Sequence, residues 1–384
     1  MRSEWKIRKI SDIAEVNPRE SIRKGSIAKK IPMDVLQPFT RDVPSYQMEE
    51  YKGGTKFRNM DTIMARITPC LENGKIAQVR CLNNKEVGFG STEYIVFRAK
   101  EGTDPDYLYY LIRSPLVRDP AIKSMVGSSG RQRVQTNVVS NLQIAVPDYK
   151  EQVKIGELLR ELDDKIEINN QINKNLLQQA GAIFNKFYDE SPNQQPFTSL
   201  IEVFGGGTPK TGNRDFWDGP IPFFTPRDVG TPYTFQTEKY ITESGLAHCN
   251  SRLYHKDTTF VTARGTVGKV SLAGIPMAMN QSCYALASEI VDPLLVYFYV
   301  LKAVASLKHK ASGAVFDAIV TRDFDSETIN VLSDDDAKSV LAIINPMMEA
   351  IHNNSEENIR LVALRDSLMP RLMSGEIDVS DIDF

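Results

Sequence analysis

The 384-residue sequence has few cysteines, and none of the four is spaced for a paired metal or disulfide motif. Cys70, Cys81, Cys249 and Cys283 form no CxxC pair, which argues against a zinc site and against a secreted disulfide framework. No apolar run reaches the roughly 18 residues that a membrane span needs, and the charged start MRSEWKIRKI lacks the apolar core of a signal peptide. We therefore expect a soluble cytoplasmic protein without membrane contact and without a metal site.

Catalytic signatures are also missing from the sequence. It contains no GxxxxGK[ST] phosphate loop, no GxGxxG after a strand, no GxSxG, no HExxH and no Asn-Pro-Pro-aromatic tetrad of amino-methyltransferases. The stretch GTVGK at 265–269 is too short for a phosphate loop, so we interpret it as a turn between strands. The sequence predicts no catalytic residues and no cofactor site in this chain.

The net charge of −3 conceals an uneven distribution. Residues 1–150 carry 25 bases and 17 acids, and residues 191–333 are nearly balanced with 12 bases and 13 acids. The segments 151–190 and 334–384 together carry 9 bases and 19 acids. A basic block favours a polyanionic partner, whereas the acidic segments should avoid phosphate and favour contacts with proteins.

An internal repeat with an offset near 185 residues covers most of the chain. LQIAVP at 142–147 aligns with ETINVL at 327–332, and each is a short alternating apolar strand before an acid-rich helix start. Arg66 in the motif ARIT resembles Arg264 in the motif ARGT, so we expect equivalent places at strand ends. We favour a structural ion pair or a phosphate contact for these two arginines. If the two domains recognise different nucleotide sequences, residues repeated in both are poor candidates for base recognition. The repeat predicts two similar globular domains, each followed by a long helix.

Two segments carry the alternating steps of three and four that define a heptad seam. From 155 to 187 the seam reads Ile, Leu, Leu, Ile, Asn, Asn, Leu, Ala, Ile, Phe, and the repeat has asparagines at the same two places. An antiparallel pairing of the helices would set Asn169 against Asn358 and Asn173 against Asn354, where the amides would fix the register. The alternative is that each helix packs only on its own domain.

These features predict an α+β fold with a pseudo-twofold internal repeat, in which two long helices form an antiparallel coiled coil between two globular domains. Arg365 interrupts the second apolar seam and is expected to disturb it. The predicted boundaries are 1–148 and 191–333 for the domains, 149–190 for the first helix, and 334–384 for the second helix with the tail. Two domains held apart by long helices suit a protein that reads two half-sites on duplex DNA. Half-sites one helical turn apart are separated by roughly 34 Å.

Three segments resemble the specificity subunits of Type I restriction-modification enzymes. Residues 205–229 (GGGTPKTGNRDFWDGPIPFFTPRDV) resemble the opening of a target recognition domain in that family. Residues 163–187 (DDKIEINNQINKNLLQQAGAIFNKF) and 364–377 (LRDSLMPRLMSGEI) resemble its first conserved helix and the end of its second. The first domain opens with WKIRKISDIA and has no GGTP run, so it matches less well.

This resemblance implies that each domain reads one half of a bipartite double-stranded DNA target, while the helices set the length of the unread spacer. It also implies two methyltransferase subunits that carry S-adenosylmethionine, and motor-nuclease restriction subunits that use ATP. The chain would direct DNA methylation and restriction in phage defence without catalysing either. Two alternatives remain, a coiled-coil scaffold that binds only proteins and an enzyme that fuses recognition to methylation or cleavage.

Candidate DNA contacts are basic and amide side chains near glycines and turns, because such groups reach groove edges and phosphates. The loop GSSGRQR at 127–133 offers them in the first domain, with a solvated turn as the alternative, and the polar turn inside 205–229 offers them in the second. The predicted DNA-binding residues are Arg19, Arg23, Lys24, Arg131, Gln132, Arg133, Lys210, Thr211, Asn213, Arg214, Arg227 and Lys310. Aromatic side chains can stack on bases, but we expect the four near this turn to lie in the core. They are Phe216, Trp217, Phe223 and Phe224.

Overall fold

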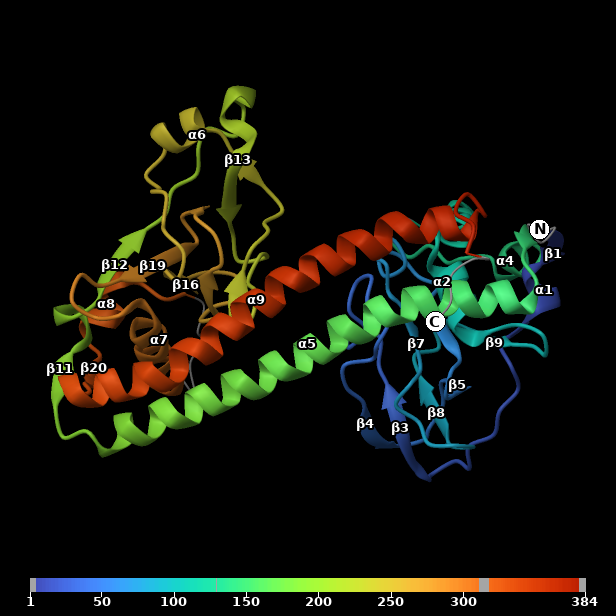
Figure 1. Ribbon diagram of the computed structural model, residues 1–384, viewed down its shortest axis with the longest axis horizontal. Helices are drawn as coiled ribbons and strands as arrows, with labels where there is room; N and C mark the ends of the chain where they lie inside the picture. Colours follow the sequence, from blue (N-terminus) through green and yellow to red (C-terminus); the bar gives the residue numbers. More distant parts are fainter. Residues whose placement is uncertain (1–4, 129, 311–317, 380–384) are drawn as a thin grey trace. The chain divides into compact units, whose positions relative to one another are not determined.

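The computed structural model describes residues 5–128, 130–310 and 318–379. Internal contacts divide the chain into two units, Met1–Ile168 with Asn358–Phe384, and Asn169–Glu357. Each unit contains one globular domain and one half of each long helix (Figure 1).

Short strands build the first unit into two four-stranded sheets and a separate pair. The strands are β1 (Lys6–Lys9), β2 (Ala14–Val16), β3 (Ile27–Ile31), β4 (Gln47–Glu50), β5 (Thr55–Arg58), β6 (Thr62–Ala65), β7 (Ile76–Gln78), β8 (Val87–Gly90), β9 (Tyr94–Ala99) and β10 (Gln143–Val146). One sheet has the antiparallel order β2-β9-β6-β7, and the other has the order β4-β3-β8-β5 with β3 parallel to β8. The pair β1·β10 joins the start of the domain to the strand that leads into the first long helix.

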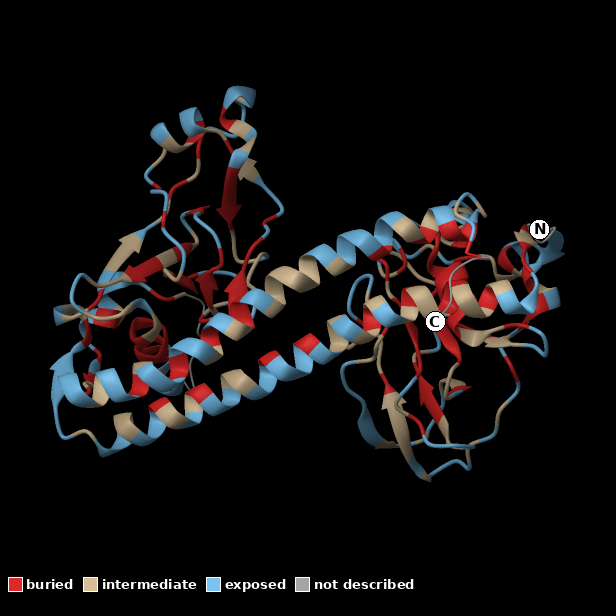
Figure 2. Cartoon of the chain, in the orientation of Figure 1, coloured by how far each residue is buried: buried red, intermediate tan, exposed pale blue. Residues whose placement is uncertain are grey.

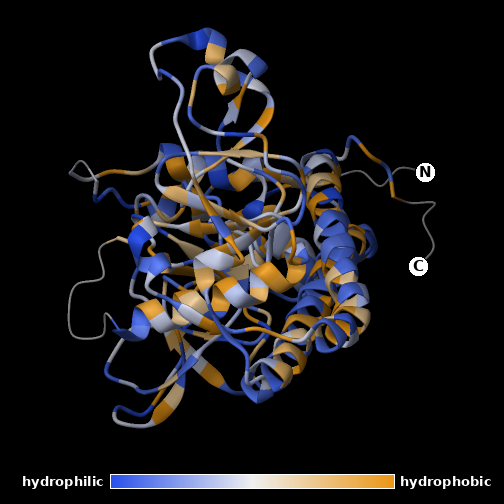
Figure 3. Cartoon of the chain, turned by 90° about the vertical axis from the view of Figure 1, so that its left-hand side faces the viewer, coloured by the Kyte–Doolittle hydropathy of each residue, from blue (hydrophilic) through white to orange (hydrophobic). Residues whose placement is uncertain are grey.

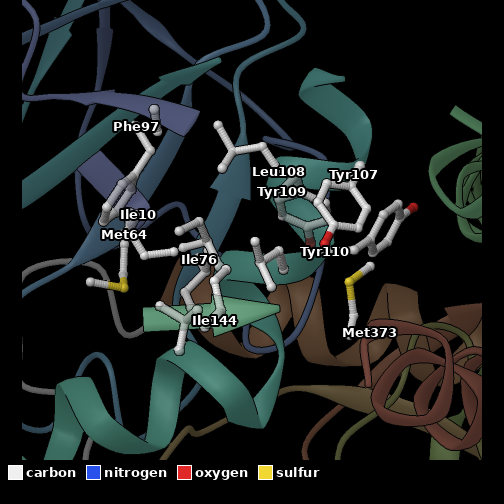
Figure 4. Packing of buried hydrophobic residues seen from close by; sticks show 14 of the residues in the cluster. Ile10, Met64, Ile76, Phe97, Tyr107, Leu108, Tyr109, Tyr110, Ile144 and Met373 are labelled. Atoms are coloured by element: carbon white, nitrogen blue, oxygen red, sulfur yellow. The ribbon is translucent and has the colours of Figure 1, made fainter. Parts of the chain in front are cut away.

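The helix α2 forms the centre of the first core. The helices of this unit are α1 (Ile10–Ile13), α2 (Pro105–Arg113), α3 (Pro115–Lys123), α4 (Thr136–Ser140) and the first part of α5 (Tyr149–Glu190). Asp104 caps α2 by accepting a hydrogen bond from the amide of Tyr107, and proline at the first helical position fits the missing donor there. Figure 2 shows α2 as buried, and Figure 4 shows Tyr107 and Tyr110 packed beside Met373.

The second unit repeats the plan of the first. Its strands are β11 (Gln194–Pro196), β12 (Glu202–Gly205), β13 (Trp217–Phe224), β14 (Tyr233–Thr234), β15 (Tyr240–Ile241), β16 (Thr259–Thr262), β17 (Val270–Ala273), β18 (Ala278–Met279), β19 (Cys283–Ala287) and β20 (Thr328–Asn330). The sheet β12-β19-β16-β17-β14 begins with the same order as β2-β9-β6-β7, and the pair β11·β20 matches β1·β10. The strands predicted within 142–147 and 327–332 are confirmed as β10 and β20.

Helix α7 packs against the sheet of the second domain as α2 packs against the equivalent sheet of the first. The helices are η1 (Phe197–Ser199), η2 (Arg214–Phe216), α6 (Glu243–Ala247), α7 (Pro293–Lys310), α8 (Thr321–Asp325) and the first part of α9 (Asp334–Met373). The apolar run at 293–301 lies inside α7, and most of its side chains are buried. Among the described residues, we find no helix with both the length and the apolar character needed to cross a bilayer.

The long helices α5 and α9 pack against each other in antiparallel sense within each unit, and Figure 3 shows hydrophilic and hydrophobic residues alternating along them. In the second unit the amide of Asn354 donates to Asn173 Oδ1 at 2.9 Å, as predicted. Asn169 donates to Glu357 Oε2 at 2.7 Å in the same unit. Asn358 belongs to the first unit, so its pairing with Asn169 stays a prediction.

Arg365 does not disturb the seam, contrary to expectation. Its side chain is 3% exposed, and its guanidinium donates to Asp163, which is also buried. The hydroxyl of Tyr110 donates to the other oxygen of Asp163 at 2.7 Å, so the buried charges are paired and bonded. The equivalent seam positions in the second unit hold Met348 and Ala180, both buried, so the polar pair exists on one side of the repeat only.

Candidate nucleic-acid interface

Strand ends of the first domain surround a hollow of about 480 Å³. It is lined by Asn17, Pro18, Arg19, Glu20, Gly54, Thr55, Lys56, Arg66, Thr92 and Tyr94. Three of these residues are bases, and the described lining has a single acid, Glu20. Burial acts to raise the pKa of Glu20, but hydrogen bonds from Arg98 and Arg58 outweigh burial and lower it. Because that carboxylate is already neutralised, the hollow presents net positive charge.

Glu93 joins the hollow to the predicted loop at 127–133. Arg133 donates to the carboxylate of Glu93 from Nε at 3.0 Å and from Nη2 at 2.7 Å. Arg66 Nε lies 3.6 Å from Glu93 Oε2 and is buried without a hydrogen bond to the residues that the structure describes. The bonds from Arg133 are the largest cause of the lowered pKa of Glu93, so this carboxylate is ionised at neutral pH.

The remaining predicted residues of that loop are held differently. Arg131 is exposed. The amide of Gln132 donates to the hydroxyl of Thr68 at 2.8 Å, and the carbonyl of Gln132 accepts from the amide of Thr68 at 3.0 Å. Gly127 has φ +138°, and a Cβ there would lie 2.9 Å from the carbonyl oxygen of Arg131, so this position requires glycine. Residue 129 of the predicted loop lies outside the described residues.

Only one residue of the predicted phosphate patch lines the hollow. Arg19 does, together with Lys56 and Arg66. Arg23 and Lys24 are exposed in the turn before β3 and are not part of its lining. The structure therefore brings Arg19 to the basic hollow and leaves the other two on a separate turn.

The second domain has a corresponding hollow of about 740 Å³. It is lined by Thr225, Pro226, Arg227, Glu238, Lys239, Arg264, Gly265, Thr266, Lys269, Asn280 and Ser282. Four of these residues are bases, and Glu238 lies 3.5 Å from the predicted DNA contact Arg227. Sequence reasoning missed Lys56, Lys239 and Lys269, although each of them lies next to a strand end.

Backbone hydrogen bonds show which residues of the two domains are equivalent at these hollows, and they shift the predicted equivalence of the two arginines by one residue. The amide of Arg66 donates to the carbonyl of Glu93, and the amide of Ala263 donates at 2.8 Å to that of Ser282. Arg66 is therefore equivalent to Ala263, and the prediction that it is equivalent to Arg264 is wrong by one residue. The loop after this strand is longer in the first domain than in the second, so alignment of the motifs ARIT and ARGT placed the two arginines together although the strands are offset by one residue. Both arginines still line their hollows.

The polar turn at 210–214 lies at the opposite end of β13 from the second hollow. Lys210, Thr211 and Arg214 are exposed around η2, and the side chain of Asn213 caps this turn by accepting from the amide of Asp215. Figure 1 shows the start of β13 and α6 at the outer tip of this unit. The eight residues of β13 span about 26 Å in extended conformation, so these four residues do not share a site with Arg227.

Lys310 has a different partner from the one predicted. Its ammonium group bonds Glu327 Oε1 at 2.5 Å, and the side chain of Glu327 is 2% exposed. Because an unpaired buried carboxylate is costly, Lys310 is occupied as its counter-ion in this conformation.

The aromatic residues near the opening motif belong to the core, as expected. Phe216, Phe223 and Phe224 are buried, and the partly buried Trp217 donates from its indole nitrogen to the carbonyl of Lys210. Within the described ranges, no three His, Cys, Asp or Glu side chains gather closely enough to hold a metal ion.

Comparisons with known proteins agree with this architecture. A family model described as the Type I restriction modification DNA specificity domain matches residues 2–178 and 196–361. The HindI specificity subunit of Haemophilus influenzae is 24% identical over 88% of this chain and 89% of its own length. The MjaIX specificity subunit of Methanocaldococcus jannaschii is 27% identical over 41% of this chain, which spans 38% of that relative. The crystal structure of a Type-I restriction-modification system S subunit from M. genitalium shares the fold, with a TM-score of 0.59 at 12% identity over 97% of this chain and 96% of that one.

Proposed function

The chain belongs to the Type I restriction-modification DNA specificity family, and from this premise we propose that it reads a bipartite double-stranded DNA target. The domains at 1–148 and 191–333 each take one half-site. The basic hollows at matching places in the two domains carry this proposal, because each offers several cations beside acids that already have partners. Cations of this kind bind phosphates and set the position of the protein on the duplex.

Base reading then falls to residues that differ between the two domains. Phosphates are the same at every half-site, so cations that line both hollows, such as Arg66 and Arg264, can position both domains alike although they are not equivalent residues. Sequence discrimination needs donors and acceptors that the repeat does not share. Arg133 beside Glu93 in the first domain, and the exposed turn at 210–214 in the second, meet that requirement.

The long helices set the spacer between the half-sites and bind the partner subunits. Their segments 151–190 and 334–384 are acidic, so their exposed faces should avoid DNA phosphates. The internal repeat presents each partner-binding surface twice, which suits two copies of one methyltransferase subunit. Motor-nuclease restriction subunits join through the same complex.

The chemistry belongs to those partners. We propose that the methyltransferase subunits carry S-adenosylmethionine, that the motor-nuclease subunits use ATP, and that this chain directs both without catalysing either reaction. Incubation of the isolated chain with labelled S-adenosylmethionine and DNA should transfer no label. Transfer by the isolated chain would instead support an enzyme that fuses recognition with methylation.

Methylation mapping tests the proposed function as a whole. DNA from cells that express this chain with its neighbouring methyltransferase subunit is compared with DNA from cells that lack only this chain. We expect two short specified blocks around a fixed gap, methylated in the first cells and unmodified in the second. Identical methylation in both cell lines would refute the role in DNA recognition and favour a protein-binding scaffold.

A further inference from the structure

We infer that Arg133, oriented by Glu93, reads a guanine in the half-site of the first domain. This inference rests on the proposed function and adds a residue, a positioning partner and a base to it. Arg133 is 44% exposed, whereas Glu93 is 24% exposed, so the arginine is the member of the pair that reaches outward.

The hydrogen bonds between the two side chains leave one edge of the guanidinium available. Glu93 accepts from Nε and from Nη2 of Arg133, which occupy the side edge of the group. Nη1 has no partner among the described residues, and Nη2 has a second hydrogen. These two nitrogens form the terminal fork, and such a fork donates in bidentate fashion to O6 and N7 of guanine in the major groove.

The backbone of Arg133 is fixed as firmly as its side chain. Its amide donates to the carbonyl of Val126 at 2.9 Å and its carbonyl accepts from Val126 at 3.1 Å. On its other side it bridges Ile67, and the next residue, Val134, donates to the carbonyl of Arg66 at 2.8 Å. An arginine held at both ends loses little conformational entropy when it meets a base, which favours precise readout.

Charge separates base reading from phosphate binding at this place. Arg133 and Glu93 form a pair with no net charge, and the carboxylate repels a phosphate that approaches it. The neighbouring cations Arg19, Lys56 and Arg66 line the hollow and provide the phosphate contacts. A neutral pair with an outward donor fork is therefore better suited to a base edge than to the DNA backbone.

The pair is present in one domain only. Ile319 donates to the carbonyl of Ala263 as Val134 does to Arg66, and Arg264 bridges Ala318 as Ile67 bridges Arg133. The equivalents of Glu93 and Arg133 are therefore Ser282 and Ala318, which cannot form an ion pair. Recognition of two different half-sites requires residues that differ between otherwise equivalent surfaces of the two domains. The pair of Glu93 and Arg133 is such a difference.

The test uses the complex of the full chain with its methyltransferase subunit on duplexes that carry the mapped target. Each guanine of the first half-site is replaced in turn by 7-deazaguanine, which lacks the N7 acceptor. We expect wild-type methylation to fall at one guanine, by less than the roughly 5- to 150-fold that loss of both acceptors would cause. Arg133→Met keeps the length of the side chain but removes every donor, so it should methylate the normal target more slowly by a similar factor and become insensitive to the replacement.

Two further variants separate the possible roles. Glu93→Gln should weaken discrimination at the same guanine while total DNA binding is kept or increased, because a negative charge is removed from the interface. Arg371→Met is the matched control for guanine recognition, since Arg371 is also an exposed arginine bonded from Nε to a glutamate, Glu376, and lines neither hollow. Whatever this variant does to subunit assembly, its complex should keep the wild-type sensitivity to the replaced guanine.

Two results would overturn the inference. In the first, Arg133→Met retains full sensitivity to every replaced guanine. In the second, Arg133→Gln lowers the salt dependence of binding by one phosphate contact without changing sequence preference, which would make Arg133 a phosphate ligand. Either result leaves the proposed function standing as long as the wild-type complex methylates a bipartite target. Loss of bipartite methylation in the wild type itself would refute the proposed function, and this inference with it.

Discussion

Arg365→Ala should destabilise the first unit by about 3 kcal/mol, because it leaves the buried carboxylate of Asp163 without its counter-ion. Arg365 and Asp163 are 3% and 4% exposed, and removal of one partner from a buried ion pair costs about 3 to 5 kcal/mol. Asp163 keeps the hydrogen bond from the hydroxyl of Tyr110 at 2.7 Å, which places the expected loss near the lower end of that range.

The repeat supplies a matched compensating variant. The second unit has Met348 where the first has Asp163, and Ala180 where the first has Arg365, and both of these residues are buried. The double variant Asp163→Met with Arg365→Ala therefore installs residues that the chain already uses in the same seam. It removes the uncompensated charge and should recover at least about 1.5 kcal/mol, with part of the loss retained because the Tyr110 hydroxyl loses its acceptor.

Urea unfolding measures both variants. The chain has two tryptophans, Trp5 in the first unit and Trp217 in the second, so in a Trp217→Phe background the fluorescence follows the unit that contains the pair. Two results would refute the reasoning. One is a change of less than about 1 kcal/mol in the single variant, and the other is a double variant no more stable than the single one.

Three further predictions concern other polar contacts. Lys310→Gln should lower the unfolding free energy of the second unit by about 1 kcal/mol, because Glu327 loses its counter-ion, and the salt dependence of DNA binding should not change. Lys56→Gln should reduce the slope of log affinity against log salt by about 0.9 at every sequence, as filter-binding titrations would show. Leucine at both Asn173 and Asn354 should raise thermal stability but loosen the helix register, which cysteine cross-linking at alternative registers would detect.

Periodicity predicted the long helices and their pairing because both follow from spacing alone. The offset near 185 residues and the matched asparagines were enough to predict the bond between Asn173 and Asn354. Burial shifts within the seam, however, from Met347 to Met348 and from Ile183 to Phe184. A straight α-helix drifts by about 20° per heptad against a strict seven-residue repeat, so a pattern written in heptads misplaces individual side chains.

The basic hollows could not be predicted from local sequence. Lys56 lies in β5 and Arg66 follows β6, and Lys239 and Lys269 come from separate loops of the second domain, so only the sheet topology brings each pair together. The partner of Arg365 was missed for a related reason. Asp163 lies one position beside the predicted apolar seam, and an apolar pattern gives no sign of a charge that is buried because it has a partner.

Glu93 illustrates the same limit at the candidate interface. Sequence reasoning selected Arg133 for its donors and its neighbouring glycines, but the glutamate that orients it lies 40 residues earlier in the chain. The register of β6 with β9 and the bridge from Ile67 to Arg133 bring the two together. Long-range strand pairing, rather than any motif, therefore creates the feature that distinguishes the two domains.

Exchange of residues 191–333 tests the central claim most directly, which is that each domain owns one half-site. The segment is replaced by the corresponding domain of a relative with a different target, and methylated sites are mapped in cells with the same methyltransferase subunit. The account predicts that one specified block changes, while the other block and the gap are retained. Change in both blocks, or in neither while methylation continues, would contradict it.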